Sequence, residues 1–357
     1  MKFAAPAGQN PIDRLTIVGK SVDRIDGPLK VTGSAPYAYE RLDVARNVAY
    51  GYVLGAAIAK GRIQSMVTGE ARAAPGVLAI ITAENAGRLH RAERNTAPLL
   101  GGPEIAHYHQ AIALVVAETF EQARAAANLI RVHYEAAEGN FDLVAAMDTA
   151  KPKDIHGGAG DSRVGSFESD FASAPVRLDA TYTTPDQAHA MMEPHASIAT
   201  WRGSELTLWT SSQMIDWCAT DLAETLGIRR ERVHVLSPYV GGGFGGKLFL
   251  RADALLAALG ARAASRAVKV ALPRALMMNN TPRRPATIQR IRLGATRDGK
   301  LTAIGHQSWS GDLPHGKADG AVHQTRMLYA AEHRMTATRL AVLDLPEANS
   351  MRAPGEA

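Results

Sequence analysis

Five glycines within six positions form the strongest chemical signal in this sequence, in the segment Gly241–Lys247 (GGGFGGK). Glycine has no side chain that would keep a ligand away from the backbone, so several N–H groups can approach one bound group. The flanking segments read as a short strand, Arg232–Leu236, and an apolar helix, Ala252–Ala264. N–H groups at the start of a helix favour a bound anion. The sequence therefore predicts an anion-binding loop, against the simpler reading of a sterically tight turn.

A phosphate-binding loop of nucleoside triphosphatases fits this segment incompletely. Gly241, Gly246 and Lys247 match the pattern G-x-x-x-x-G-K. The next residue would be a Ser or Thr that binds magnesium, but Leu248 stands there. The departure removes the metal contact and makes this reading remote.

A dinucleotide-binding dehydrogenase is a second remote alternative. Gly241, Gly243 and Gly246 match G-x-G-x-x-G, but an acidic residue that binds the ribose should end the next strand. The predicted strand Val268–Leu272 is followed instead by Pro273 and Arg274. An arginine could meet a 2′-phosphate, so the alternative stays open.

Other residue types with chemical potential carry weaker signals. His189, Glu193 and His195 have the spacing H-x-x-x-E-x-H, which would place the first two one helical turn apart. Pro194 disfavours helix at that point, so we expect structural hydrogen bonds there and no metal held by the protein. The single cysteine, Cys218, predicts a small buried apolar side chain. It excludes an internal disulfide and an iron–sulfur cluster built from this sequence alone.

The elements that would position these residues indicate a mixed α/β fold. Strand patterns occur at Tyr37–Tyr39, Ala49–Ala57, Val77–Thr82, Ile112–Ala117, Val176–Thr184 and Leu206–Thr210, and helical patterns at Thr119–Val132 and Gln213–Leu226. Ile112–Ala117 should be buried, Val176–Thr184 half-buried, and Thr119 with Gln122 a capping box. We expect an extended arm at 1–20, a first domain at 21–138, a linker at 139–175 and a second domain at 176–357.

Composition excludes several classes of protein. With 46% hydrophobic and 21% charged residues, the 357-residue chain is typical of a globular protein of two or three domains. The apolar runs fall far short of a bilayer span, and the first residues carry no leader pattern. From Arg229 onward there are 20 Lys and Arg against 9 Asp and Glu, which favours an anionic ligand or an acidic partner. The basic residues are scattered, so nucleic-acid binding is not expected.

Several further segments, in order, resemble one family. They are VDRIDGPLKVTGSAPYAYE (Val22–Glu40), YHQAIALVVAETFEQARAAA (Tyr108–Ala127), QAHAMMEPHASIATW (Gln187–Trp201), LTLWTSSQ (Leu206–Gln213), SPYVGGGFGGK (Ser237–Lys247) and MRAPGEA (Met351–Ala357). Together they resemble the molybdenum-binding large subunit of the xanthine dehydrogenase and aldehyde oxidase family, above all the bacterial aldehyde oxidoreductases of the periplasmic type. The resemblance implies an α/β hammerhead domain at 21–138 and the first part of a molybdopterin-binding domain at 176–357.

The resemblance also implies a molybdopterin cofactor, here in the cytosine dinucleotide form, with molybdenum held by the pterin. Its anionic pyrophosphate suits a glycine loop in basic surroundings. Phe244 and Gly245 match positions against the metal centre, and Gln213 matches a glutamine that hydrogen-bonds the metal's oxo ligand or the pterin. Arg352 matches the active-site arginine, whose charge would stabilise a substrate oxygen. The implied cofactor-binding set is Gln213, Gly241, Gly242, Gly243, Phe244, Gly245 and Arg352.

The implied reaction converts an aldehyde and water to a carboxylic acid, with hydride passing to molybdenum. Leu248 occupies the place of an acidic residue in purine-oxidising members, which favours an apolar or aromatic aldehyde. Electrons would leave through a separate [2Fe–2S] subunit and an FAD subunit of a heterotrimer. The compartment is then the cytoplasm or the periplasm, with export only alongside a partner subunit.

One expected part of the machinery is missing from this sequence. The family's catalytic glutamate lies in a G-x-G-E motif that the sequence does not contain, and Glu356 of MRAPGE is not that base. Two hypotheses follow: the sequence is the N-terminal half of an active molybdenum hydroxylase subunit, or it is a non-catalytic fragment or interaction module. On either one, the 357-residue chain alone is expected to be inactive.

Overall fold

The computed structural model describes residues 16–155 and 158–352. The chain divides into two units, residues 1–36 and 37–357. In the first unit, helix α1 (Gly27–Val31) has Pro28 in its first turn, and Lys30 forms an ion pair with Asp26. The arm predicted at 1–20 lies mostly outside the described residues.

A seven-stranded sheet forms the centre of the second unit and joins distant parts of the sequence. Its strand order is β13 (Val233–Leu236), β12 (Glu205–Thr210), β11 (Ala196–Arg202), β14 (Val268–Ala271), β1 (Ala49–Gly55), β5 (Ala111–Ala117) and β3 (Val77–Thr82). The junction is the parallel pairing of β1 with β14, where Ala49 lies opposite Val268. The two domains predicted from the sequence therefore share one sheet.

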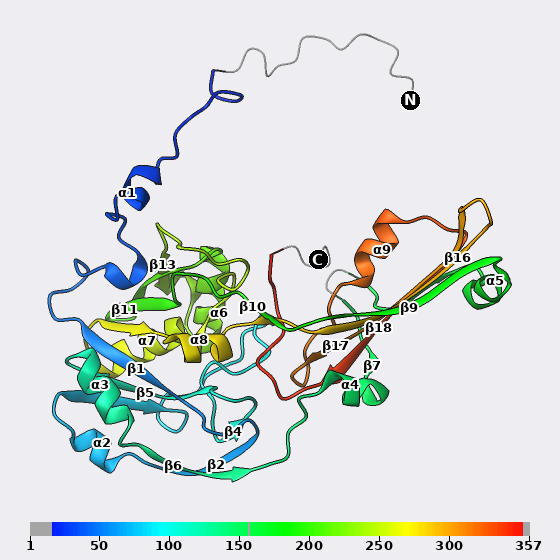
Figure 1. Ribbon diagram of the computed structural model, residues 1–357. Coiled ribbons are helices and arrows are strands. Elements are labelled where there is room, and N and C mark those ends of the chain that lie inside the picture. The colour runs from blue at the N-terminus through cyan, green and yellow to red at the C-terminus, as the bar shows by residue number, and fades with distance from the viewer. Residues whose placement is uncertain (1–15, 156–157, 353–357) are drawn as a thin grey trace. The chain divides into compact units, whose positions relative to one another are not determined.

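Helices cover both faces of this sheet. Helix α7 (Ala252–Ala264), yellow in Figure 1, packs on the face that carries Leu114 and Val116. A Cβ at Gly260 would lie 2.9 Å from Leu114 Cδ2, so this glycine allows the helix to approach β5 closely. Helix α3 (Phe120–Ala127) packs on the opposite face. Every residue of β5 is buried, which confirms the predicted buried strand.

Several smaller elements extend this core. Helix α6 (Ile215–Leu226) ends at Gly227, whose positive φ of 64° allows the left-handed C-cap. A three-stranded sheet has the order β4 (Glu104–Ile105), β2 (Gly61–Val67), β6 (Arg131–Ala136), and α2 (Gly69–Ala73) follows β2. Helix α8 (Arg274–Asn280) follows β14, and β10 (Gln187–Ala188) pairs with β15 (Arg283–Arg284).

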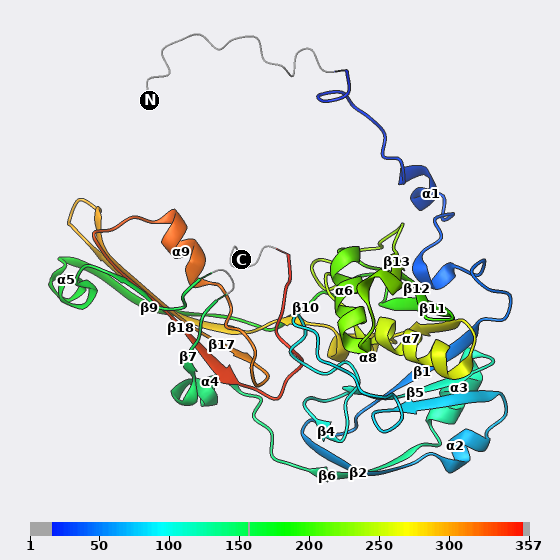
Figure 2. The ribbon, with the colours of Figure 1, turned by 180° about the vertical axis from the view of Figure 1, so that it is seen from behind.

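A six-stranded sheet lies further along the chain. Its order is β7 (Lys151–Pro152), β18 (His333–Val342), β17 (Leu301–Asp312), β16 (Thr287–Ala295) and β9 (Val176–Thr184), with β8 (Ser162–Val164) also paired to β18. Figure 2 shows β9, β17 and β18 as one elongated sheet. Helix α4 (Leu143–Ala146) packs with Ala341 of β18, and helix α9 (Val322–Leu328) packs with Leu340. These two neighbours in β18 point to opposite faces of the sheet, so the helices lie on opposite faces.

Most predicted elements agree with the structure, and three do not. Tyr37–Tyr39 is no strand, because Tyr37 caps a 3₁₀ turn at Ala38–Glu40. The helix predicted at Thr119–Val132 ends at Ala127, and its last residues belong to β6. Strand β9 exists, but only two of its nine residues are even partly buried, because it is an edge strand and both of its faces are largely open.

The segment 139–175, predicted as a linker, carries several short elements. They are α4, the 3₁₀ turn Met147–Thr149, β7, β8 and α5 (Phe167–Ser173). Strands β7 and β8 pair with β18, so the segment contributes to the six-stranded sheet.

The predicted capping box at α3 is confirmed and gives a stability test. Thr119 Oγ1 accepts from Gln122 N at 3.2 Å, and Gln122 Oε1 accepts from Thr119 N at 3.2 Å. We expect Thr119→Ala to lower the free energy of unfolding by about 1 kcal/mol, because the Gln122 N–H loses its acceptor. Ser166→Ala is the matched control, since Ser166 precedes α5 without a side-chain cap. Equal losses in denaturant unfolding of the two variants would contradict this assignment.

Candidate functional site

The glycine loop Gly241–Lys247 adopts backbone conformations that require its sequence. Gly242 and Gly245 have φ values of 95° and 97°, and Phe244 has a φ of 51°. A bulky residue in the left-handed region is rare and marks a site held in place by its surroundings. Helix α7 begins only at Ala252, so the loop is not the helix N-terminus that the sequence suggested. The loop N–H groups must therefore be considered one by one, without help from a helix dipole.

Gln213 holds the loop from one side. Its Oε1 accepts from Gly245 N at 3.0 Å and from Lys247 N at 3.2 Å, and its own N donates to Lys247 O at 2.8 Å. A Cβ at Gly243 would lie 2.3 Å from Oε1, so that position excludes a side chain. Because Oε1 is engaged by the loop, the Gln213 amide has its Nε2 left to donate elsewhere.

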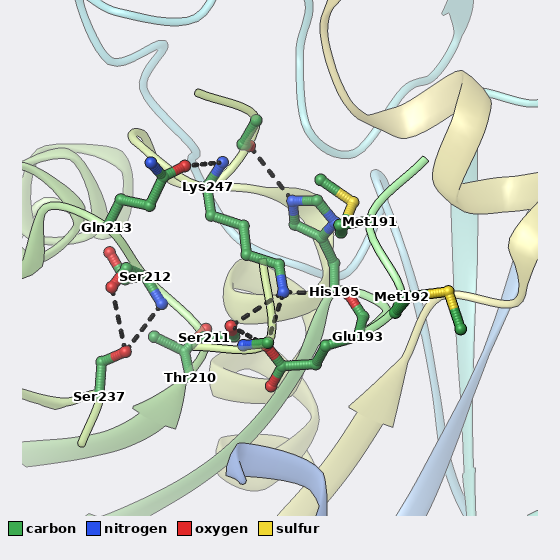
Figure 3. Close-up of polar contacts among 12 residues, drawn as sticks. Met191, Met192, Glu193, His195, Thr210, Ser211, Ser212, Gln213, Ser237 and Lys247 are labelled. Carbon is green, nitrogen blue, oxygen red and sulfur yellow. Dashed lines mark hydrogen bonds and ion pairs between the residues drawn. The ribbon is translucent and has the colours of Figure 1, made fainter. Parts of the chain in front are cut away.

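Lys247 is the most deeply buried charged side chain at the site. Its Nζ donates to Glu193 Oε2 at 2.8 Å, to Glu193 O at 3.0 Å and to Ser211 Oγ at 2.9 Å. Figure 3 shows the ammonium turned toward Ser211 and Glu193. Burial lowers the pKa of Lys247, and the hydrogen bond to Glu193 counteracts part of that effect. All three ammonium donors are used, so this lysine cannot serve a phosphate as in a nucleoside triphosphatase.

Three loop N–H groups are left for a ligand. Gly241 N donates to Glu193 Oε2, and Gly246 N donates to Gly243 O. For Gly242, Gly243 and Phe244, no backbone N–H finds an acceptor among residues 16–155 and 158–352. Gly243 is buried, Gly242 is partly buried and Phe244 is exposed, so this part of the loop is open to a ligand. These three groups and Gln213 Nε2 form a cluster of donors.

Arg352 reaches the same place from the far end of the sequence. Its backbone N donates to Phe244 O at 2.7 Å, and its guanidinium carbon lies 6.0 Å from the centre of the Phe244 ring. A Cβ at Gly245 would lie 2.9 Å from Ser350 O, so only glycine lets the two segments meet. The structure thus brings together Gln213, the loop and Arg352. Leu248, the predicted substrate-pocket residue, follows the loop and is partly buried.

Buried side chains hold the segment that carries Arg352, and of these the sequence analysis singled out His189 but not Arg251 or Glu347. Glu347 pairs with Arg251, and both side chains are almost fully buried. Its other oxygen accepts from Thr96 N at 2.7 Å and Ala97 N at 3.0 Å. His189 places Nε2 2.8 Å from Ser350 O. Arg251 and Glu347 lie in no recognisable sequence motif, so the sequence alone offered no reason to select them.

The histidines and Glu193 make structural contacts. His195 Nε2 lies 3.2 Å from Gly246 O, and burial lowers the pKa of His195 to about 3. Within the ranges that the structure describes, no three His, Cys, Asp or Glu side chains are grouped as metal ligands. Burial raises the pKa of the Cys218 thiol to about 12, in keeping with the predicted buried apolar role.

Comparison with protein families now identifies the chain. Residues 148–357 match the molybdopterin cofactor-binding domain, which is more than half of the sequence. This chain belongs to the molybdopterin cofactor-binding domain family. Residues 32–138 match the a/b hammerhead domain of aldehyde oxidase and xanthine dehydrogenase. Both matches confirm the fold that the resemblance implied, a hammerhead domain followed by a molybdopterin-binding domain.

Individual members of the family give the same picture. The chain is 61% identical over its whole length to the aldehyde oxidoreductase molybdenum-binding subunit PaoC of Escherichia coli, of which it covers 48%. It is 28% identical to the nicotinate dehydrogenase large molybdopterin subunit of Eubacterium barkeri, over 81% of this chain and 69% of that one. The chain therefore spans about half the length of the PaoC subunit that it matches.

Solved structures share the fold. The aldehyde oxidoreductase of Desulfovibrio gigas matches 93% of this chain and 39% of its own, with a TM-score of 0.80 and 21% identity. Quinoline 2-oxidoreductase of Pseudomonas putida matches 94% of this chain and 46% of its own, with a TM-score of 0.82 and 22% identity. Among the described residues of this family member, no helix has the length and apolar character needed to cross a membrane.

Asp312 links the end of β17 to the Arg352 segment and has unusual electrostatics. The fully buried carboxylate accepts from Leu313 N and from Ala348 N, each at 2.8 Å. Burial raises the pKa of Asp312 to about 7, and Glu347 adds to the effect. The hydrogen bonds from the two backbone N–H groups oppose it.

This raised pKa predicts a specific pH dependence. The folded chain holds the Asp312 proton more tightly than the unfolded chain, so its contribution is fully present below about pH 4 and is lost as pH rises through 7. At most, about 4 kcal/mol of the free energy of unfolding is lost over this pH range. We expect Asp312→Asn to remove that part of the slope of unfolding free energy between pH 4 and 7.

The control variant is Asp179→Asn, since Asp179 forms a partly exposed pair with Arg290 that lowers the pKa of Asp179. That variant should keep the wild-type slope. Denaturant unfolding at a series of pH values measures it, and an unchanged slope in Asp312→Asn would refute the assignment.

Proposed function

We propose that this chain supplies the hammerhead and first cofactor-binding parts of a molybdenum-dependent aldehyde oxidoreductase. The observation that carries the proposal is the convergence of Gln213, the N–H groups of the glycine loop and Arg352 at one place. The 61% identity to an aldehyde oxidoreductase subunit supports the choice of reaction class.

The chemistry of the donors fits a molybdopterin cofactor. The cofactor is an anion with many hydrogen-bond acceptors, and the site offers backbone N–H groups, an amide and a guanidinium. Arg352 is exposed, and its guanidinium lies beside the Phe244 ring, so its charge can face an anion at the loop. Backbone N–H groups without competing carboxylates are a common way to bind phosphate and related anions.

When bound, the cofactor supplies the redox centre for oxidation of an aldehyde to a carboxylic acid. Gln213 donates from Nε2 without adding charge, because its Oε1 is held by Gly245 and Lys247. Arg352, beside the Phe244 ring, carries a permanent charge that would stabilise negative charge on a substrate oxygen. Phe244 is half-exposed and presents its ring toward this charge.

Finer features of the proposal rest on the resemblance. The cofactor would be the cytosine dinucleotide form, whose anionic pyrophosphate suits the glycine loop. Leu248 would line the substrate pocket and favour apolar or aromatic aldehydes. Electrons would pass to an iron–sulfur subunit and an FAD subunit, and the partner would decide between cytoplasm and periplasm. The base would come from sequence beyond the half of PaoC that this chain covers.

The second candidate function is a non-catalytic fragment or interaction module. The intact mass of the protein in its source cell separates the two. A mass near that of 357 residues favours the second function, and about twice that mass favours the first.

The proposed roles are tested in protein purified from the source cell with every accompanying polypeptide. We expect pterin and molybdenum in about equimolar amount with the chain, and oxidation of benzaldehyde with an artificial acceptor. Arg352→Ala should lower kcat/KM about 10²- to 10³-fold, because charge stabilisation is lost. Gln213→Ala should lower bound pterin, because the loop loses its Oε1 acceptor and the cofactor a donor.

The matched control is Arg339→Ala, since Arg339 is an arginine of β18 paired with Asp161 away from the loop. It should leave kcat/KM within about twofold. Wild-type protein without pterin would sink the proposed function, and full activity in Arg352→Ala would sink the role of that residue.

A further inference from the structure

Glu193 contacts the two ends of the glycine loop at once. Its backbone N donates to Gly241 O at 3.3 Å, and its Oε2 accepts from Gly241 N at 2.6 Å. The same oxygen accepts from Lys247 Nζ at 2.8 Å, and Glu193 O accepts from that ammonium at 3.0 Å. Gly241 and Lys247 are the first and last residues of the loop, so one residue closes the turn.

Ser211 completes this closure. Its Oγ donates to Glu193 Oε2 at 2.6 Å and accepts from Lys247 Nζ at 2.9 Å. Oε2 of Glu193 thus receives three donors, and Lys247 Nζ has three acceptors. Figure 3 shows the three side chains converging beneath the loop. The buried ammonium thus has an acceptor for each of its N–H groups, and the loss of Glu193 would leave its charge uncompensated.

The closure decides which loop atoms remain for a ligand. Glu193 occupies the Gly241 N–H, and Gln213 occupies the N–H groups of Gly245 and Lys247. We propose that Glu193 is the positioning residue of the loop, which closes both ends so that the N–H groups of Gly242, Gly243 and Phe244 are the ones left to bind an anionic cofactor. The last clause rests on the proposed function, whereas the closure itself does not.

Charge and geometry can be separated at this residue. Glu193→Gln keeps an oxygen for the three donors but removes the countercharge of Lys247. Besides Glu193, the titratable groups that act on Lys247 or feel its charge are Asp253 and His195. Asp253 is buried and accepts a hydrogen bond from Ser197 Oγ, and burial lowers the pKa of His195 to about 3, so that His195 is neutral. Neither replaces the contact that Glu193 makes.

The first readout is amide hydrogen exchange of the 357-residue chain, measured on peptides that cover 241–247. Glu193→Gln should lower protection of this loop about tenfold relative to wild type, while β5 stays protected. Ser211→Ala, which removes one partner and no charge, should give a smaller loss at the same peptides.

The matched control is Asp344→Asn, which removes a buried carboxylate from an ion pair with another lysine, Lys60, and whose other partner is Asn140 N. It should leave loop protection unchanged. Unchanged exchange in Glu193→Gln, or an equal loop effect in Asp344→Asn, overturns the proposal.

The second readout is the pH dependence of thermal stability, which a purely steric role would not alter. In Glu193→Gln the buried ammonium favours its neutral form, so the unfolded chain binds more protons than the folded chain. The gap in midpoint temperature between wild type and Glu193→Gln should therefore narrow from pH 7 to pH 9.5. In the double variant Glu193→Gln, Lys247→Met the narrowing should vanish. A constant gap in the single variant contradicts the proposed closure by charge.

The two proposals fail separately. Pterin content of the source-purified protein tests the cofactor, and loop exchange of the chain tests the closure. Loss of loop protection in a protein that never holds pterin would uphold Glu193 as the positioning residue and refute the cofactor. If Glu193→Gln has normal pterin content although its loop has lost protection from amide hydrogen exchange, loop closure is not needed to bind the cofactor, and that part of the proposal is overturned.

Discussion

A lysine ammonium enclosed by protein is the constraint on which the site depends. Lys247 brings a charge into the interior, and that charge is tolerable only with a carboxylate and a full set of acceptors. Glu193, between β10 and β11, and Ser211, directly after β12, both accept hydrogen bonds from this ammonium. Gln213 adds hydrogen bonds to the N–H groups of Gly245 and Lys247 in the same loop. The positions of the exposed residues Phe244 and Arg352 therefore depend on the buried contacts of Lys247.

The sequence predicted those parts of the fold that depend on local pattern. The buried strand at Ala111–Ala117, the capping box at Thr119 and the helix end at Gly227 each have a local physical cause. The edge position of β9 could not be predicted from the sequence. Apolar residues alternate in the same way in a half-buried strand and in an edge strand that no other element covers. Strands β16 to β18 were not predicted, since their mixed charged and apolar residues have no clean period.

The candidate site divides in the same way. A run of glycines is visible in the sequence itself, so Gly241–Lys247 could be predicted as a binding loop. The resemblance added Gln213 and Arg352. Lys247 matched a phosphate-binding pattern in sequence, yet its side chain points inward. Glu193, Glu347 and Asp312 are far apart in sequence from what they hold, and no local pattern records a long-range hydrogen bond.

The shared seven-stranded sheet also constrains the order in which the chain can fold. Strand β1 is made early in synthesis, but its parallel neighbour β14 ends at residue 271. During translation, the edge of β1 that will meet β14 has no partner for some two hundred residues of growth. Parallel pairings of such long separation form slowly and leave unpaired edges open to other chains. The hammerhead part therefore cannot complete its sheet by itself, and a ribosome-bound intermediate with an unfinished β1 edge is a natural substrate for chaperones.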